Sequence, residues 1–279
     1  MALANQYISL RFVSRVLLFS LIFTLVQLLI FHRAKQPSAL AIALNLIDGI
    51  LLALVLGPIS LHLPFNRRTR ITVIWLALFI IQEFSNTVEA LFFTTYLSTT
   101  VLFFTASLIG LLITFIEALT AGALFNPQSR TSYSAPAIRA YFKQRSSASW
   151  VLRFAVGSLA YFVIYFTFGA MIAPFVLPYY QDSSIGLTIP SFTVMIPLEF
   201  FRGFLYVLAL FPILATLRAQ KKHAYLAAVS LLYVAGALIP FLTVSGFPIP
   251  LRIFHGLEIL ADCLVYGAVL VYLFAKSQM

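Results

Sequence analysis

Charged residues are scarce in this chain. Lys, Arg, Asp and Glu together make up 9% of its 279 residues, whereas 62% are hydrophobic. Soluble domains have about a quarter charged residues, so the composition excludes an ordinary soluble protein and indicates an integral membrane protein. Membrane spans of about 20 residues each would use most of the length. We therefore expect residues 1–279 to form a single integral membrane domain, with no segment left for a soluble one.

Cysteine is almost absent, and so are long basic stretches. The single cysteine, Cys263, lies in an apolar run, cannot form a disulfide within the chain, and is interpreted as a small packing residue. Eighteen Lys and Arg against eight Asp and Glu give a formal charge of +10. These basic residues lie singly or in short groups beside apolar runs, without interleaved aromatics. They therefore indicate membrane topology, and no nucleic-acid partner is expected.

Eight apolar runs are long enough to cross about 30 Å of hydrocarbon. The runs are continuous and do not alternate at every second residue. This favours helices over a barrel, because a helix in lipid satisfies its own backbone. The chain is therefore predicted to be an all-α, polytopic bundle of about eight transmembrane helices. The predicted spans are 8–31, 39–61, 71–97, 99–125, 150–173, 190–217, 224–243 and 252–274.

Lys and Arg between the runs fall mainly on one side of the predicted membrane. Thirteen lie on the side of the N-terminal residues, and three lie on the other side, namely Arg33, Lys35 and Arg252. Because cytoplasmic loops carry the excess of positive charge, both termini are predicted to be cytoplasmic, in a plasma membrane or a bacterial inner membrane. Arg11 and Arg15 precede the apolar run 16–31 of the first span, as in a signal peptide. That run is long for such a segment, so we expect an uncleaved span.

The connection 126–149 is the longest polar stretch. It divides the spans into four plus four, and a short surface helix is predicted near 137–143. No internal repeat is indicated. Pro190 and Pro197 open the sixth span and Pro240 interrupts the seventh. Such residues produce packing kinks or mark binding sites in broken helices, and both interpretations stay open.

Seven of the eight carboxylates lie inside the apolar runs, and Asp182 alone lies in a polar connection. A carboxylate in hydrocarbon is costly without a partner, a proton or water, so this placement indicates function. Most of these acids are predicted in the outer half of the membrane, with Glu83 near the midplane and Glu117 apart in the cytoplasmic half. The seven acids are Asp48, Glu83, Glu89, Glu117, Glu199, Glu258 and Asp262.

Helical spacing gathers these acids with other polar residues on four spans. Side chains three, four or seven residues apart lie on one helix face. Four polar faces at similar depth predict one shared cavity, open to the outside. Its predicted members are Asn45 and Asp48 in the second span, Glu83, Asn86 and Glu89 in the third, Glu199 and Arg202 in the sixth, and His255, Glu258 and Asp262 in the eighth.

Each of these residues also has a purely structural interpretation. Glu199 and Arg202 would form a buried ion pair that fixes helix packing. Asn45 and Asn86 would hydrogen-bond neighbouring helices. His255 would be solvated near the interface, and Glu117 would pair with a backbone or hydroxyl group, or keep its proton. A shared cavity is favoured because these interpretations would all have to hold independently.

The residues also suit a divalent metal. His255, Glu258 and Glu89 are suitable ligand types, and an open site could activate water for hydrolysis. The spacing is not diagnostic, because there is no His-Glu-x-x-His segment and no second histidine in any span. A divalent metal is therefore an open alternative and not a firm prediction.

The sequence favours a permease for a small solute or ion, because this function needs no missing motif. Glu89, Glu258 and Asp48 would bind a cation or proton, Glu199 with Arg202 would gate or orient, and His255 would tune the entrance. The first alternative is a membrane hydrolase, metal-dependent or not, acting on lipid or peptide. The second is a non-catalytic assembly or sensor protein. The expected partners are the lipid bilayer and an unidentified solute or ion.

Overall fold

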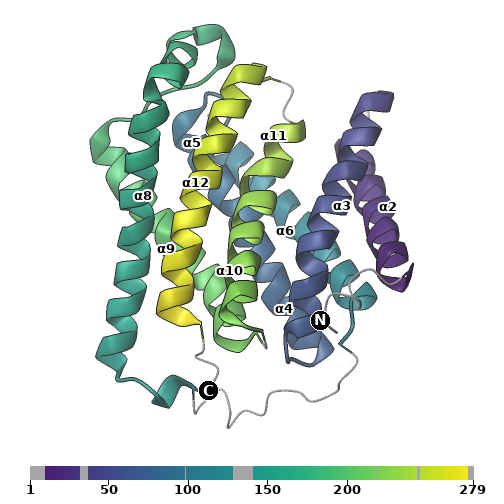
Figure 1. Cartoon of the computed structure of the whole chain (residues 1–279). Coiled ribbons are helices and arrows are strands. Elements are labelled where there is room, and N and C mark those ends of the chain that lie inside the picture. Colours follow the sequence, from purple (N-terminus) through teal and green to yellow (C-terminus); the bar gives the residue numbers. More distant parts are fainter. Residues whose placement is uncertain are drawn as a thin grey trace.

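The chain folds into a bundle of long helices. The computed structural model describes residues 10–31, 37–97, 99–127, 141–217, 219–243 and 246–275. Eight helices in these ranges are long and apolar enough to cross a membrane (Figure 1). The extended pairing in the described ranges is one isolated bridge, between Thr94 and Leu187. The all-α bundle of about eight spans is confirmed.

Each predicted span coincides with one observed helix or broken helix. Five spans are continuous, one is extended at its end, and two contain a wider turn of π-helix. In chain order they are α2 (Leu10–Phe31), α3 (Ala39–His62), α4 (Arg67–Leu78) with η1 (Phe79–Phe84) and α5 (Ser85–Phe93), α6 (Thr100–Leu124), α8 (Ser147–Gln181), α9 (Phe192–Thr216), α10 (Lys221–Ser230) with η3 (Leu231–Leu238) and α11 (Ile239–Thr243), and α12 (Ile249–Phe274).

Helix α8 is longer than the apolar run that predicted it. The run ends at residue 173, but the helix continues through Pro174 and Pro178 for a total of 35 residues, or about 52 Å. That exceeds the hydrocarbon thickness of about 30 Å. Val176 in this extension belongs to a small hydrophobic cluster with Leu187 and Leu251, and this packing stabilises the extension.

The third and seventh spans are interrupted by η1 and η3, which lie against each other. An added Cβ at Gly236 of η3 would lie 3.2 Å from Ile81 Cγ2 of η1, so the two segments approach closely. The amide of Asn86 donates to Gly236 O at 2.8 Å and to Gln82 O at 2.9 Å. The break in the seventh span is therefore this π-helical turn, and the helix continues through Pro240.

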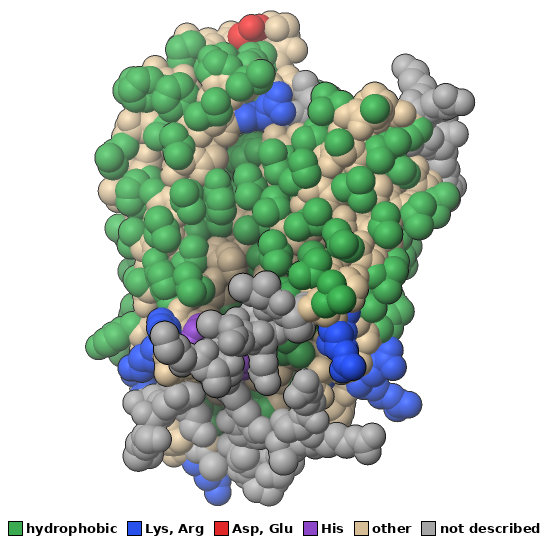
Figure 2. Space-filling model, turned by 45° about the vertical axis from the view of Figure 1, so that its right-hand side comes forward, with side chains coloured by type: hydrophobic (Ala, Val, Ile, Leu, Met, Phe, Trp, Pro, Cys, Tyr) green, Lys and Arg blue, Asp and Glu red, His purple; other side chains and the backbone are tan. Residues whose placement is uncertain are grey.

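The two ends of the bundle differ in charge. We call them the Asp182 end, where α5, α8 and α11 finish, and the Trp150 end, where α8 begins. Among the described Lys and Arg residues, Arg252 is at the Asp182 end, Arg202 is buried in the bundle, and the others are at the Trp150 end. Figure 2 shows the apolar belt between these levels. Arg33 and Lys35, counted for the predicted orientation, lie outside the described residues, and the orientation stays a prediction.

An aromatic cluster packs α8, α9 and α12 together at the Trp150 end. Tyr141 donates a hydrogen bond from its hydroxyl to Phe274 O at 2.7 Å. Burial raises the pKa of Tyr141 to about 12, so the hydroxyl keeps the proton that it donates. Residues 141–143 are helical, in agreement with part of the predicted surface helix, whereas 137–140 lie outside the described residues. The rings in contact here are those of Tyr141, Phe142, Trp150, Phe154, Phe211 and Phe274.

Candidate functional site

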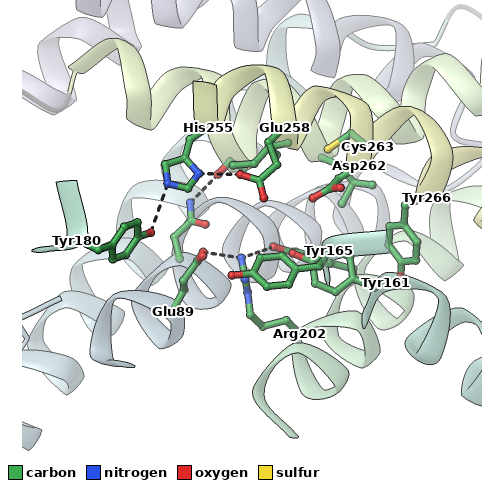
Figure 3. Close-up of a pocket in the computed structure, with 15 residues that line it drawn as sticks. Glu89, Tyr161, Tyr165, Tyr180, Arg202, His255, Glu258, Asp262, Cys263 and Tyr266 are labelled. Carbon is green, nitrogen blue, oxygen red and sulfur yellow. Dashed lines mark hydrogen bonds and ion pairs between the residues drawn. The ribbon is translucent and has the colours of Figure 1, made fainter. Parts of the chain in front are cut away.

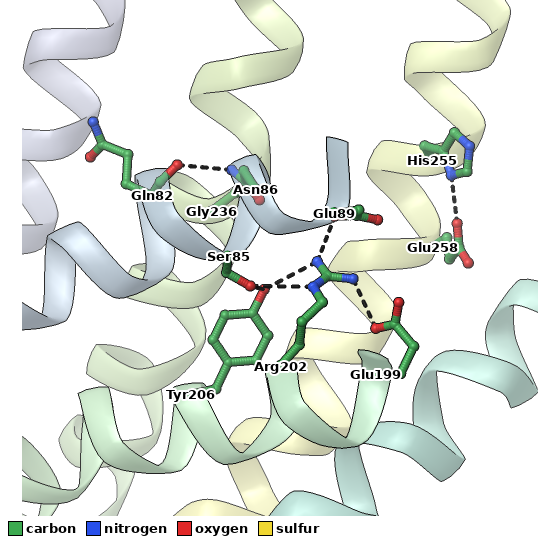
Figure 4. A network of polar contacts seen from close by, with 10 residues as sticks. All are labelled: Gln82, Ser85, Asn86, Glu89, Glu199, Arg202, Tyr206, Gly236, His255 and Glu258. Atoms are coloured by element: carbon green, nitrogen blue, oxygen red, sulfur yellow. Dashed lines mark hydrogen bonds and ion pairs between the residues drawn. The ribbon is translucent and has the colours of Figure 1, made fainter. Parts of the chain in front are cut away.

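A buried arginine is at the centre of the site. Helix α9 places Glu199 and Arg202 one turn apart, and Arg202 Nη1 donates to Glu199 Oε2 at 2.8 Å. Its Nη2 donates to Glu89 Oε2 of α5 at 2.6 Å (Figure 4). Glu199 is fully buried, whereas the Glu89 side chain is 33% exposed. One guanidinium therefore joins a buried carboxylate to one that faces open space.

Two further donors of Arg202 are also paired. Its Nε donates to Ser85 Oγ at 3.2 Å, and its Nη2 lies 3.3 Å from the Tyr206 hydroxyl. The guanidinium also lies over the ring of Tyr161, 5.7 Å from its centre. A buried charge is tolerated when it is paired and hydrogen-bonded, and here two carboxylates and two hydroxyl groups contact the guanidinium.

A second polar group comes from α12. His255 Nδ1 and Glu258 Oε2 are hydrogen-bonded at 2.7 Å, and His255 Nε2 lies 3.3 Å from the hydroxyl of Tyr180 on α8. Asp262 lies one turn further along, is 3% exposed, and its Oδ1 has no hydrogen-bond partner in the described part of the chain. The predicted face of α12 therefore points into the bundle.

These groups surround a pocket that we call the acidic pocket. Its volume is about 70 Å³, and carboxylates and tyrosines face each other across it (Figure 3). Its lining includes Asn86, Glu89, Tyr161, Tyr165, Tyr180, Arg202, Tyr206, His255, Glu258, Asp262, Cys263 and Tyr266. The tyrosines come mostly from α8, so they close one side of the pocket.

The acidic pocket adjoins a wider chamber of about 680 Å³, which we call the vestibule. Asn86, Glu89, Tyr180 and His255 line both spaces. The other vestibule walls include Thr94, Tyr96, Leu187, Gly246 and Phe247, which lie in the connections at the Asp182 end. The loop from α8 is fixed over this end because Thr95 N donates to Gly186 O at 3.0 Å and Thr188 N to Phe93 O at 2.8 Å.

The site has more negative than positive groups. Four carboxylates, Glu89, Glu199, Glu258 and Asp262, are found with one arginine and one histidine. Carboxylates therefore outnumber cations by two even when His255 is protonated. In a low-dielectric interior such an excess calls for a bound cation or for protons.

The structure divides the predicted residue set between two pockets. Asn86, Glu89, Arg202, His255, Glu258 and Asp262 line the acidic pocket, with Glu199 directly behind Arg202. Asn45, Asp48 and Glu83 line a neighbouring pocket of about 670 Å³, which shares Asn86 with the acidic pocket.

The residues divide between two pockets because different helices pack against different faces of the third span. The seventh span lies between α3 and α12 (Figure 1). Glu89 points to α9, but an added Cβ at Gly110 of α6 would lie 2.8 Å from Glu83 Oε2, so Glu83 points to α6. The tyrosines of the acidic pocket were not predicted. Tyrosine is common in apolar helices, and no sequence pattern distinguishes these tyrosines from others.

The predicted metal ligands do not form a common ligand set. Glu89 is paired with Arg202, while His255 is paired with Glu258. Across the described ranges, no three His, Cys, Asp or Glu side chains come together in an arrangement that could hold a metal ion.

Comparisons with known proteins give no relative for this chain: no family model, curated protein or solved structure matches it. Its function is therefore inferred from the geometry of the site.

Proposed function

We propose that the protein is a membrane carrier for a small organic cation, which binds in the acidic pocket. The observation that supports this best is the excess of carboxylates over cations in a pocket walled by tyrosines. A bound cation would balance that charge. Tyrosine faces also attract ammonium groups, with about 0.5–2 kcal/mol for each contact.

The sizes of the two spaces fit such a ligand. The vestibule, about 680 Å³, lies within the range of about 300–1,000 Å³ for small-molecule sites. The acidic pocket, about 70 Å³, accommodates only a small group. An ammonium head would lie between Glu89 and Glu258, and the rest of the molecule would extend into the vestibule.

A carrier also needs a site that is open to one side at a time. The site described above adjoins the vestibule at the Asp182 end, and the aromatic cluster packs α8, α9 and α12 together at the Trp150 end. The π-helical turn η3 contributes Leu232 and Gly236 to the lining of the acidic pocket, and Pro197 lies in α9 just before Glu199. Interrupted helices next to a central site are a recurring feature of carriers.

Within this proposal the charged residues have distinct roles. Glu89, Glu258 and Asp262 bind the cation or exchange protons. Arg202 with Glu199 orients Glu89, and His255 with Tyr180 forms the entrance from the vestibule.

Uptake by proteoliposomes tests the proposal. Radiolabelled choline and tetramethylammonium are suitable probes because both carry a permanent charge and do not diffuse through lipid. Loss of a charge-assisted contact costs about 1.5–3 kcal/mol, so Glu258→Gln and Asp262→Asn should reduce uptake about tenfold or more. The matched control is Asp182→Asn, which removes an exposed acid outside the pocket. Equal uptake by all variants, or no uptake of either probe by the wild-type protein, would count against a cation carrier.

A second candidate is a membrane hydrolase, because Glu258 fixes His255 as in a general base. In this case His255→Gln would abolish hydrolysis of a lipid or peptide pool by the purified protein. The wild-type protein itself would take up no choline. If Ala substitutions at Glu89 and Glu258 change only stability, the assembly function is favoured.

A further inference from the structure

The pocket that contains Asp48 has a different character from the acidic pocket. It lies between α3 and the segment η1–α5, and its volume is about 670 Å³. Its polar lining consists mainly of Asn45, Asp48, Gln82, Glu83, Asn86 and Thr87. None of the described residues that line it is Lys, Arg or His. We call it the Asp48 pocket.

Asp48 is completely buried without a partner. Its exposed fraction is 0%, and neither carboxylate oxygen has a hydrogen-bond partner in the described ranges. The position is rigid, because an added Cβ at the neighbouring Gly49 would lie 2.7 Å from Ser20 Cα of α2. Helix α3 is therefore held closely against α2 beside Asp48.

Two further acids continue from this pocket into the bundle. The amide Nε2 of Gln82 lies 3.3 Å from Glu83 Oε1 and 3.3 Å from Glu117 Oε1. Glu117 is 3% exposed, and its Oε2 has no partner among the described atoms. Gln82 thus connects the acid at the pocket wall to an acid deeper in the bundle.

The depths of these acids form a sequence across the membrane. Asp48 lies nine residues from the first residue of α3, or about 14 Å from the Asp182 end. Glu117 lies seventeen residues from the first residue of α6, or about 26 Å from the same end. The pocket begins near Ser38 and Leu97 at the Asp182 end. The pocket, Asp48 and Glu117 together extend most of the way across about 30 Å of hydrocarbon.

Among the described residues of the packed elements, no cation faces these acids. From α2 the pocket is lined by Gln27, and from α11 by Thr243. The basic residues of α4 and α10, which also pack on α3, lie in the first turns of those helices at the Trp150 end. A carboxylate that is buried without a counter-charge requires a proton or a cation. The described acids do not gather into a metal-binding group, and a proton on each acid would meet this requirement.

We propose that Asp48, Glu83 and Glu117 form a proton-binding path that drives the carrier. This inference rests on the proposed cation transport. Protons enter the Asp48 pocket from the Asp182 end and bind Asp48 or Glu83. The Gln82 amide donates to both Glu83 and Glu117, so it holds these two carboxyl groups beside each other for proton transfer through water and accepts no proton itself. Asn86 lines both the Asp48 pocket and the acidic pocket, and it is hydrogen-bonded to Gly236. A change in the contact between η1 and η3 on protonation would therefore alter both the Asp48 pocket and the acidic pocket.

Two transport measurements test this path in proteoliposomes that contain the full chain. The first is exchange of radiolabelled choline at equal pH on both sides, and the second is choline accumulation driven by a pH gradient. Asp48→Asn should keep exchange within about twofold of wild type and reduce gradient-driven accumulation about tenfold or more. Asp182→Asn should leave both unchanged. Accumulation by Asp48→Asn at the wild-type level would overturn the inference.

Infrared spectroscopy tests the proton site without transport. The purified protein should show a protonated carboxyl C=O band that is altered in Asp48→Asn and, as a second variant, in Glu83→Gln. If the wild-type protein exchanges no choline, the carrier proposal fails, and this band alone decides whether the proton site exists. A band unchanged in both variants would refute the proton site, even if choline transport is observed.

Discussion

At the scale of single residues, Arg202 is the side chain on which the site depends most. It compensates Glu199, which is fully buried, and Glu89, which reaches the pocket. The pair of Glu199 and Arg202 was predictable, because the two are one helical turn apart in the sequence. Glu89 as a second partner was not, because the sequence does not say which helix faces α9.

Substitution of Arg202 should therefore be strongly destabilising. Arg202→Met leaves two carboxylates without a cation, and removing one partner of a buried pair costs about 3–5 kcal/mol. Thermal or denaturant unfolding in detergent micelles measures this loss. The double variant Arg202→Met, Glu199→Gln should recover part of it, because the uncompensated buried charge is gone. A single variant as stable as wild type would show that the ion pair contributes nothing.

At the scale of helices, the apolar runs predicted the spans well but not their irregularities. Hydropathy identifies which residues prefer hydrocarbon, so all eight spans were found, and seven of them have both ends within four residues of the prediction. The extension of α8 and the π-helical turns depend on contacts with other helices. An example is the contact between Gly236 and Ile81, which no local sequence pattern indicates.

Close helix packing makes a prediction for α8 and α9. An added Cβ at Gly203 would lie 2.4 Å from Ser158 O and 2.9 Å from Tyr161 Cβ, next to Arg202. Gly203→Ala should separate the helices, with a loss of about 1–3 kcal/mol in the free energy of unfolding. Gly256→Ala is the matched control, because its nearest atom would be Tyr233 Oη at 3.9 Å. Equal stability of the two variants, measured by thermal unfolding in micelles, would disprove a packing role for Gly203.

At the scale of the whole molecule, the sequence predicted which faces are polar but not how they meet. Residue spacing places Asp48 and Glu258 each on a polar face at similar depth. It does not reveal that the seventh span lies between them and separates the acidic pocket from the Asp48 pocket. The order of helices around a bundle is set by packing between distant segments, so it could not be derived from periodicity.

The orientation of the bundle decides which side of the membrane the vestibule faces. Because Lys and Arg gather at the Trp150 end, that end is predicted to be cytoplasmic. In a Cys263→Ser background, exposed Ser183→Cys at the Asp182 end should react with an impermeant maleimide in intact cells. Exposed Gln144→Cys at the other end should react only after permeabilisation. The reverse labelling would mean that the vestibule and the Asp48 pocket open to the cytoplasm. Protons and the cation would then enter these pockets from inside the cell.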